Sequence, residues 1–161
     1  MVARNLIQTL QKLLQLHQNL YKVTLQKTES LKSEKVEELK ELLKKEQMFV
    51  QAIKQIEAER IEMTSKFLGR SEELTLSACI EKAEAEEKET LQRIANDFNE
   101  TMDKLKATIQ INRELTQQAL QFVSLSLDML IPQESFTNYQ RPDGNKAQSE
   151  KVRRSLFDSQ A

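Results

Sequence analysis

The chain has 161 residues, of which 30% are charged and only 5% aromatic, and its 24 Lys and Arg nearly balance its 25 Asp and Glu. This composition offers few large apolar side chains for a compact globular core. The near-neutral net charge provides no positive potential to bind a phosphate backbone or an anionic membrane. We therefore expect an elongated helical protein and exclude nucleic acid as a partner.

Glycine and proline, the residues that stop helices, are almost missing. The chain has two Gly and two Pro, whereas average usage would place about 19 such residues in this length. Neither type occurs before Gly69, and neither occurs again until Pro132. The sequence therefore predicts two very long helical arms joined by a turn near residues 69–75.

The first arm begins with apolar residues at three- and four-residue steps, which gathers them on one face of a helix. This stripe contains Ile7, Leu10, Leu14, His17, Tyr21 and Leu25, and a second stripe beside it contains Leu6, Leu13, Leu16, Leu20 and Val23. Ten of the fifteen residues from Lys32 to Glu46 are charged, which interrupts the pattern. The sequence fits either one bent helix or two helices with a break near residues 30–33 and Ser33 as N-cap.

After this charged stretch the apolar spacing resumes and alternates three and four, as in a coiled-coil heptad. The positions are Leu39, Leu42, Glu46, Phe49, Ile53, Ile56, Arg60, Met63 and Phe67. Glu46 and Arg60 are the polar exceptions. Each either lies at the margin of the seam with its charged end in water or makes a polar contact that sets the register.

The second arm has the most regular heptad pattern in the chain. It runs through Leu91, Ile94, Phe98, Thr101, Leu105, Thr108, Asn112, Leu115, Ala119, Phe122, Ser126 and Met129. A second stripe, rotated by roughly 100° from the first, contains Leu120, Val123, Leu127, Leu130 and Ile131.

The predicted fold is all-α: a long antiparallel helical hairpin or coiled coil, or a three-helix bundle if the break near residues 30–33 folds back. In the plain hairpin, facing residues have numbers that add to about 140, so the N-terminal third faces Leu115–Ile131. A two-helix seam buries one stripe per helix, so the second stripes need another partner. That partner is the chain's own tail, a third helix, a second subunit or a client protein.

Pro132 is expected to end the helical region at residue 131, leaving residues 132–161 as a linker and a binding segment. The linker carries a predicted turn at residues 142–145 and two aromatic residues, Phe136 and Tyr139, typical of anchors to a partner. The flexible tail then ends in a short amphipathic helix, whose apolar face contains Val152, Leu156 and Phe157. It either packs on the chain's own hairpin or serves as a helix-in-groove recognition element.

No pattern in the sequence predicts catalysis, a metal site or a cofactor. The single histidine, His17, excludes paired-histidine metal motifs, and two glycines cannot form a phosphate-binding loop. The single cysteine, Cys79, cannot form an internal disulfide, the N-terminus lacks a signal-peptide pattern, and no stretch approaches the roughly 20 apolar residues that span a bilayer. We expect a cytoplasmic, non-enzymatic protein without membrane insertion.

Several of these features resemble the FlgN family of flagellar export chaperones. Lys45, the apolar run Met48–Ile56 and Arg60 match the family's pattern of a Lys, an apolar stretch and an Arg in a long helical region. The family also has an Asn-rich entry to an apolar last helix, followed by a Tyr and a Gly. The chain shows the same order in Ile111–Leu115, Ala119–Ile131, Tyr139 and Gly144.

The resemblance implies a chaperone that binds the C-terminal helices of the hook-filament junction proteins, which are FlgK- and FlgL-like hook-associated proteins. It also implies delivery of these clients to the flagellar type III export gate, with Tyr139 as a gate or client contact. We expect the client surface to contain Leu120, Val123, Leu127, Leu130, Ile131, Phe136, Tyr139, Val152, Leu156 and Phe157, and the protein to be a monomer or a weak dimer. The alternative is a homo-oligomeric coiled-coil scaffold without a client.

Overall fold

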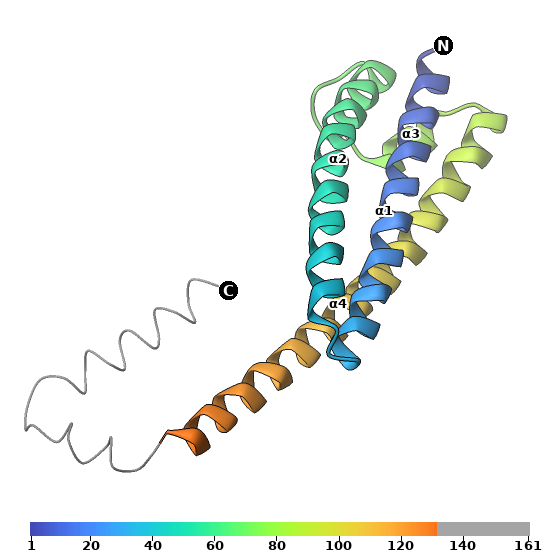
Figure 1. Cartoon of the computed structure of the whole chain (residues 1–161). Coiled ribbons are helices and arrows are strands. Elements are labelled where there is room, and N and C mark those ends of the chain that lie inside the picture. The colour runs from blue at the N-terminus through green and yellow to red at the C-terminus, as the bar shows by residue number, and fades with distance from the viewer. Residues whose placement is uncertain (132–161) are drawn as a thin grey trace, which may run out of the picture. The chain divides into compact units, whose positions relative to one another are not determined.

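The computed structural model describes residues 1–131, which form four helices. The helices are α1 (Val2–Lys32), α2 (Val36–Leu68), α3 (Leu76–Lys82) and α4 (Ala85–Leu130), as Figure 1 shows. No strand occurs among the described residues, so the predicted all-α class is confirmed. The chain divides into two units, Met1–Ala119 and a second that begins at Leu120, and each is described by itself below.

The chain reverses direction at residues 33–35, where α1 gives way to α2. Glu34 takes the left-handed conformation (φ 57°), and the Lys35 N–H donates to the Ser30 carbonyl at 3.1 Å. This is the hydrogen bond of a Schellman motif, with a glutamate where glycine is usual. Ser33 is therefore the C-cap of α1, and the expectation that it caps the next helix was wrong: the N-cap of α2 is Lys35, without a side-chain cap.

Gly69 ends α2, as its isolation in the sequence predicted. Its φ is 69°, in the left-handed region that favours glycine, and its N–H donates to the Ser65 carbonyl at 2.8 Å. The short helix α3 then begins at Thr75, whose hydroxyl accepts a hydrogen bond from the Ala78 N–H at 3.1 Å. After α3 the chain is extended at Ala83 before α4 begins.

Side-chain contacts fix the direction of α4 relative to α1. The rings of His17 and Phe98 lie 5.4 Å apart, and the Thr28 hydroxyl donates to Oδ1 of Asn112. In these pairs the number of the α4 residue is 81 and 84 higher than that of its α1 partner. Because this offset stays nearly constant along both helices, α1 and α4 run parallel to each other. The expected antiparallel register, in which the N-terminal third faces Leu115–Ile131, was therefore wrong, because α2 reverses the chain once more than a single hairpin would.

The reversal supplies the additional partner that the second stripe of α1 required. α1 packs against α2 along its length and contacts α4 through the pairs just described. Residues of both α1 stripes are consequently buried, namely Leu6, Leu10, Leu13, Leu14 and Val23. The sequence left several candidates for the partner of this stripe, and the structure of the unit Met1–Ala119 shows that the partner is a third helix. This unit is therefore a three-helix bundle with α3 packed at one end.

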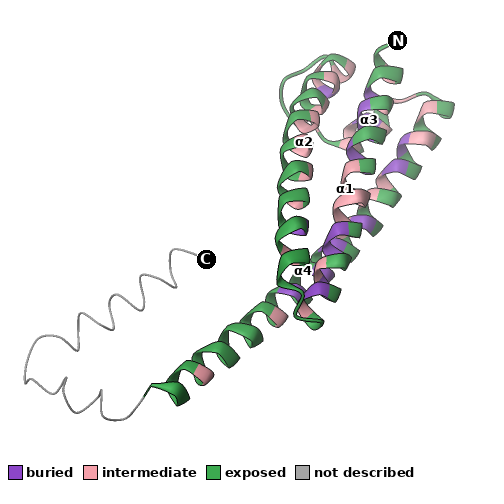
Figure 2. Cartoon of the chain, in the orientation of Figure 1, coloured by how far each residue is buried: buried purple, intermediate pink, exposed green. Residues whose placement is uncertain are grey.

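The core of this unit lies at the end that contains α3. Leu6, Leu10, Cys79, Leu91 and Ile94 form one buried cluster, so α1, α3 and α4 all contribute to it. The α2 side chains Met63 and Phe67 pack against the cluster from the last turns of that helix. Figure 2 shows buried residues along α1 and the first part of α4.

Farther along α1 and α4 the contact between them is polar. The Asn112 side chain donates from Nδ2 to the Thr24 carbonyl at 3.0 Å and accepts the Thr28 hydroxyl hydrogen bond. All three residues are buried, and Thr108 is buried one turn before Asn112. Buried polar groups of this kind stabilise only the alignment in which they meet, so we assign the parallel register of α1 and α4 to this layer.

Replacing Asn112 by Ala should lower the free energy of unfolding by about 1–3 kcal/mol, because the Thr28 hydroxyl and the Thr24 carbonyl lose a partner in a buried position. Urea denaturation followed by circular dichroism measures this change. The matched control is Asn99→Ala, an exposed asparagine on the same helix, which should change stability by less than about 0.5 kcal/mol. Equal effects of the two substitutions would contradict the role assigned to Asn112.

The two polar residues in the α2 seam both make specific contacts. Glu46 Oε2 lies 2.7 Å from Lys27 Nζ, which joins α2 to α1. Arg60 binds the Glu57 carboxylate and donates to the Leu74 carbonyl at 3.1 Å, which ties α2 to the segment before α3. Of the two interpretations offered by the sequence, the structure favours the polar contact that aligns neighbouring segments.

Candidate partner-binding surface

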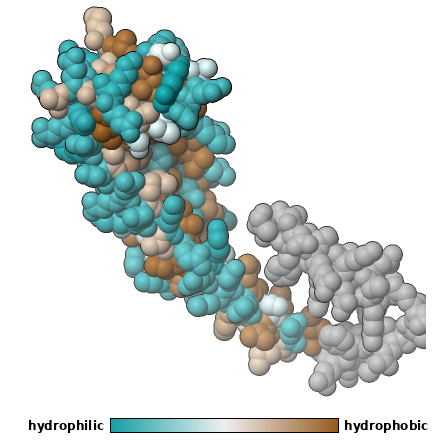
Figure 3. All heavy atoms as spheres, turned by 180° about the vertical axis from the view of Figure 1, so that it is seen from behind, coloured by the Kyte–Doolittle hydropathy of each residue, from teal (hydrophilic) through white to brown (hydrophobic). Residues whose placement is uncertain are grey.

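The second unit begins with the last turns of α4 and the residue that follows them, Leu120–Ile131, which we call the terminal apolar segment. Most of its large apolar side chains are exposed, and Figures 2 and 3 show this exposure and the apolar character of the segment. The exposed residues are Leu120, Phe122, Val123, Leu125, Leu127, Met129, Leu130 and Ile131. Exposed fractions reach 87% for Met129 and 77% for Leu130.

The apolar residues extend around most of the helix rather than along one stripe. With a rotation of about 100° per residue, Gln121, Ser124 and Asp128 share one narrow polar face. The remaining arc, roughly 240° wide by the same helical geometry, is apolar except for Ser126. A helix that is apolar over so much of its circumference is normally buried. This segment is therefore a surface that requires a partner.

The arc has two faces, which we treat separately. The stripe face contains Leu120, Val123, Leu127, Leu130 and Ile131, the residues expected from the sequence. The heptad face contains Phe122, Leu125 and Met129. Asp128 is the one charged residue of the segment, and it lies on the polar face, between Ile131 of the stripe face and Leu125 of the heptad face on the helical circumference.

Of the ten predicted site residues, the structure describes the five of the stripe face, and all five are exposed. The other five, Phe136, Tyr139, Val152, Leu156 and Phe157, lie outside the described residues.

The heptad face was missed as a candidate surface, because its spacing continues the coiled-coil pattern. That pattern is buried at Leu91, Ile94 and Leu105, yet Phe122 and Met129 are exposed. With the offset of 81 to 84 residues, Lys32 at the end of α1 is level with residues 113–116 of α4. The heptad spacing alone therefore could not show that the heptad face is exposed. The signal that could have shown it is the residue at which α1 ends.

The electrostatic character of the bundle differs from that of the terminal apolar segment. Glutamate and lysine pairs cover the exposed helix faces of Met1–Ala119. For example, the ammonium of Lys66, 2.6 Å from Glu62, lowers the pKa of that carboxyl, and Lys104 does the same to Glu100. Such pairs keep these helix faces hydrated, whereas the terminal apolar segment has one charged residue among twelve.

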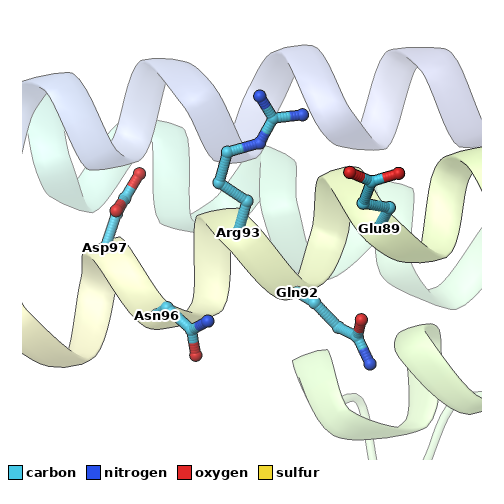
Figure 4. A pocket seen from close by; sticks show the side chains of 5 residues that line it. All are labelled: Glu89, Gln92, Arg93, Asn96 and Asp97. Atoms are coloured by element: carbon cyan, nitrogen blue, oxygen red, sulfur yellow. The ribbon is translucent and has the colours of Figure 1, made fainter.

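A polar hollow lies on the surface of α4 within the unit Met1–Ala119. It is lined by Glu89, Gln92, Arg93, Asn96 and Asp97, all from one helix (Figure 4). These side chains fan outward from the helix, and the hollow contains no serine, cysteine or histidine that could act as a nucleophile. We assign no chemistry to it.

Residues 1–131 contain no group of three or more His, Cys, Asp or Glu side chains placed to hold a metal ion. In the same part of the chain, no helix combines the length and the apolar character needed to cross a bilayer.

The fold and the terminal apolar segment define an all-helical protein-binding module, and comparison with known proteins identifies its family. The family model described as FlgN protein matches residues 1–147, so the chain belongs to the FlgN family of flagellar export chaperones, which is not a family of enzymes. The chain is also 44% identical over 162 residues to the "Uncharacterized protein YvyG" of Bacillus subtilis (strain 168), covering 100% of both chains. No solved structure matches the chain.

Proposed function

We propose that this chaperone binds the C-terminal helices of the hook-filament junction proteins, the FlgK- and FlgL-like hook-associated proteins, in the cytoplasm. It prevents their premature assembly and delivers them to the flagellar type III export gate. Membership of the FlgN family supports interaction with flagellar proteins. The observation that carries the proposal is the exposed apolar arc of Leu120–Ile131.

The chemistry of the surface fits helical clients. A client helix that stays unassembled until export exposes an apolar stripe, and helix-to-helix burial on the terminal apolar segment covers that stripe. Each fully buried Leu-type side chain contributes about 1.5–3 kcal/mol. We include Phe136, Tyr139, Val152, Leu156 and Phe157 of the tail in the client surface, with Tyr139 as a gate or client contact. Ordering of the tail on binding costs free energy and so offsets part of this gain. The affinity for the client therefore stays moderate, which allows release at the gate.

The test is co-expression of the full chain with each hook-associated protein of the same bacterium, followed by size-exclusion chromatography with light scattering. We expect a complex that elutes as one species, and a client-free chain that is a monomer or a weak dimer. Replacing Leu156 and Phe157 by Ala should weaken the complex without unfolding the bundle.

The second candidate is a homo-oligomeric coiled-coil scaffold, which the same exposed arc also favours because a second copy can cover it. A stable dimer that captures neither junction protein, and that stays intact when residues 133–161 are deleted, would support the scaffold and overturn the chaperone proposal.

A further inference from the structure

We propose that, in the client-free protein, the chain's own C-terminal segment Ser149–Asp158 docks on the stripe face of the terminal apolar segment and covers it. The tail then acts as an internal occupant of the stripe face, which a client displaces before the released tail contacts the client itself. The displacement by a client rests on the proposed function, whereas the occupancy of the surface by the tail does not.

The exposed apolar area is the first argument. Five large apolar side chains of the stripe face lie within twelve residues, and each is at least 41% exposed in the described part of the chain. A soluble chain gains stability by covering such a surface whenever a covering segment is within reach. The segment Ser149–Asp158 carries a matching apolar set in Val152, Leu156 and Phe157.

The length of the chain after Ile131 is the second argument. The 17 residues of Pro132–Gln148 separate the two segments. To dock antiparallel, the tail must return along the helix by at most about 17 Å, the rise of the terminal apolar segment. For comparison, a Gly/Ser-rich random coil of 17 residues has an r.m.s. end-to-end distance of roughly 21–25 Å. Because the linker length and the span are similar, the effective concentration of the tail at the stripe face is high.

Charge complementarity is the third argument. Asp128, the one charged residue of the terminal apolar segment, lies three residues before Ile131 of the stripe face. The last turn of α4 contains no basic residue, so the negative end of its helix dipole also lacks a cation from its own helix. Arg153 and Arg154 adjoin the apolar set of the tail and supply positive charge to both.

The experiment attaches a nitroxide spin label to a Ser155→Cys variant of the full chain and records amide intensities by NMR. Cys79 is buried, and burial raises the pKa of its thiol, so it stays protonated and resists labelling at neutral pH. We expect the amides of Leu120–Ile131 to lose most of their intensity. The loss should disappear when Leu156 and Phe157 are also replaced by Ala, and it should weaken with Asp128→Asn.

A matched mixing experiment separates the chain's own tail from that of a second copy. Spin-labelled chain without ¹⁵N is mixed with unlabelled ¹⁵N chain, and intramolecular docking predicts no intensity loss in the mixture. A loss of equal size in the mixture, or amides of Leu120–Ile131 that keep their intensity in the labelled chain, would overturn the proposal.

Adding a junction protein to the labelled chain tests the displacement separately. Recovery of the amide signals on complex formation supports a switch between tail and client. Tail docking without any complex would refute the proposed function and leave the internal occupancy standing, so the two failures are distinguishable.

Discussion

Replacing Leu127 and Leu130 together by glutamate should abolish stable capture of a hook-associated protein. Both side chains lie on the stripe face and are exposed in the described part of the chain. Burying two leucines contributes about 3–6 kcal/mol, and their loss corresponds to a roughly 100-fold or larger drop in affinity. Two introduced carboxylates add a desolvation penalty in the same interface. Isothermal titration calorimetry with the purified client measures the change.

A control variant separates a local effect from a general change in surface charge. Met48→Glu places a carboxylate at an apolar residue of α2 that is 70% exposed and belongs to the unit Met1–Ala119. Its client affinity should equal that of the parent chain. Because Leu127 and Leu130 do not belong to the buried core of the unit Met1–Ala119, their double variant should also melt at the parent temperature. If the control lost affinity to the same extent, the client surface would not be the terminal apolar segment.

A Leu91→Ala substitution should produce the largest loss of stability of any single change discussed above. Leu91 is 1% exposed and belongs to the cluster that joins α1, α3 and α4. Truncation of a buried leucine costs about 2–5 kcal/mol, since the removed methyl groups lose their burial and leave a cavity. Small domains have total stabilities of about 5–15 kcal/mol, so a large part of the folding free energy is removed. Urea denaturation of the full chain measures it.

The matched control is Leu125→Ala, the same substitution on the same helix at a residue that is 64% exposed. Its effect on unfolding should stay within about 0.5 kcal/mol. Similar losses in the two variants would mean that the exposed and buried parts of α4 contribute equally, contrary to the burial pattern. The two variants therefore test the division of α4 into a structural part and a binding part.

The helical class and much of the candidate surface could be predicted because both depend on local features. Two long stretches without glycine or proline leave helix as the regular structure, and Gly69 supplies the left-handed residue that ends α2. The excess of apolar residues from Leu120 onward is visible in the sequence alone. The client contacts of the tail remain predictions, since they fall outside the described residues.

The turn at Glu34 illustrates why the order of the bundle could not be derived in the same way. A glutamate in the left-handed conformation is locally unfavourable by about 1–2 kcal/mol, so no residue rule places a reversal there. The packing of α1 against α2 and the ion pair between Lys27 and Glu46 form only after the chain has turned. Contacts between distant residues thus offset a local cost that the sequence pattern could not reveal.

By itself, the sequence determined that this protein is helical, that a helix ends at Gly69, and that the region before Pro132 is too apolar to remain without a partner. Only the tertiary structure decided that α1 and α4 run in parallel and that the heptad pattern of α4 changes from buried to exposed. The physical reason is that periodicity defines which face of a helix is apolar, whereas burial requires a second helix at the same level. α1 ends at Lys32, and Phe122 and Met129, which continue the same pattern in α4, are exposed.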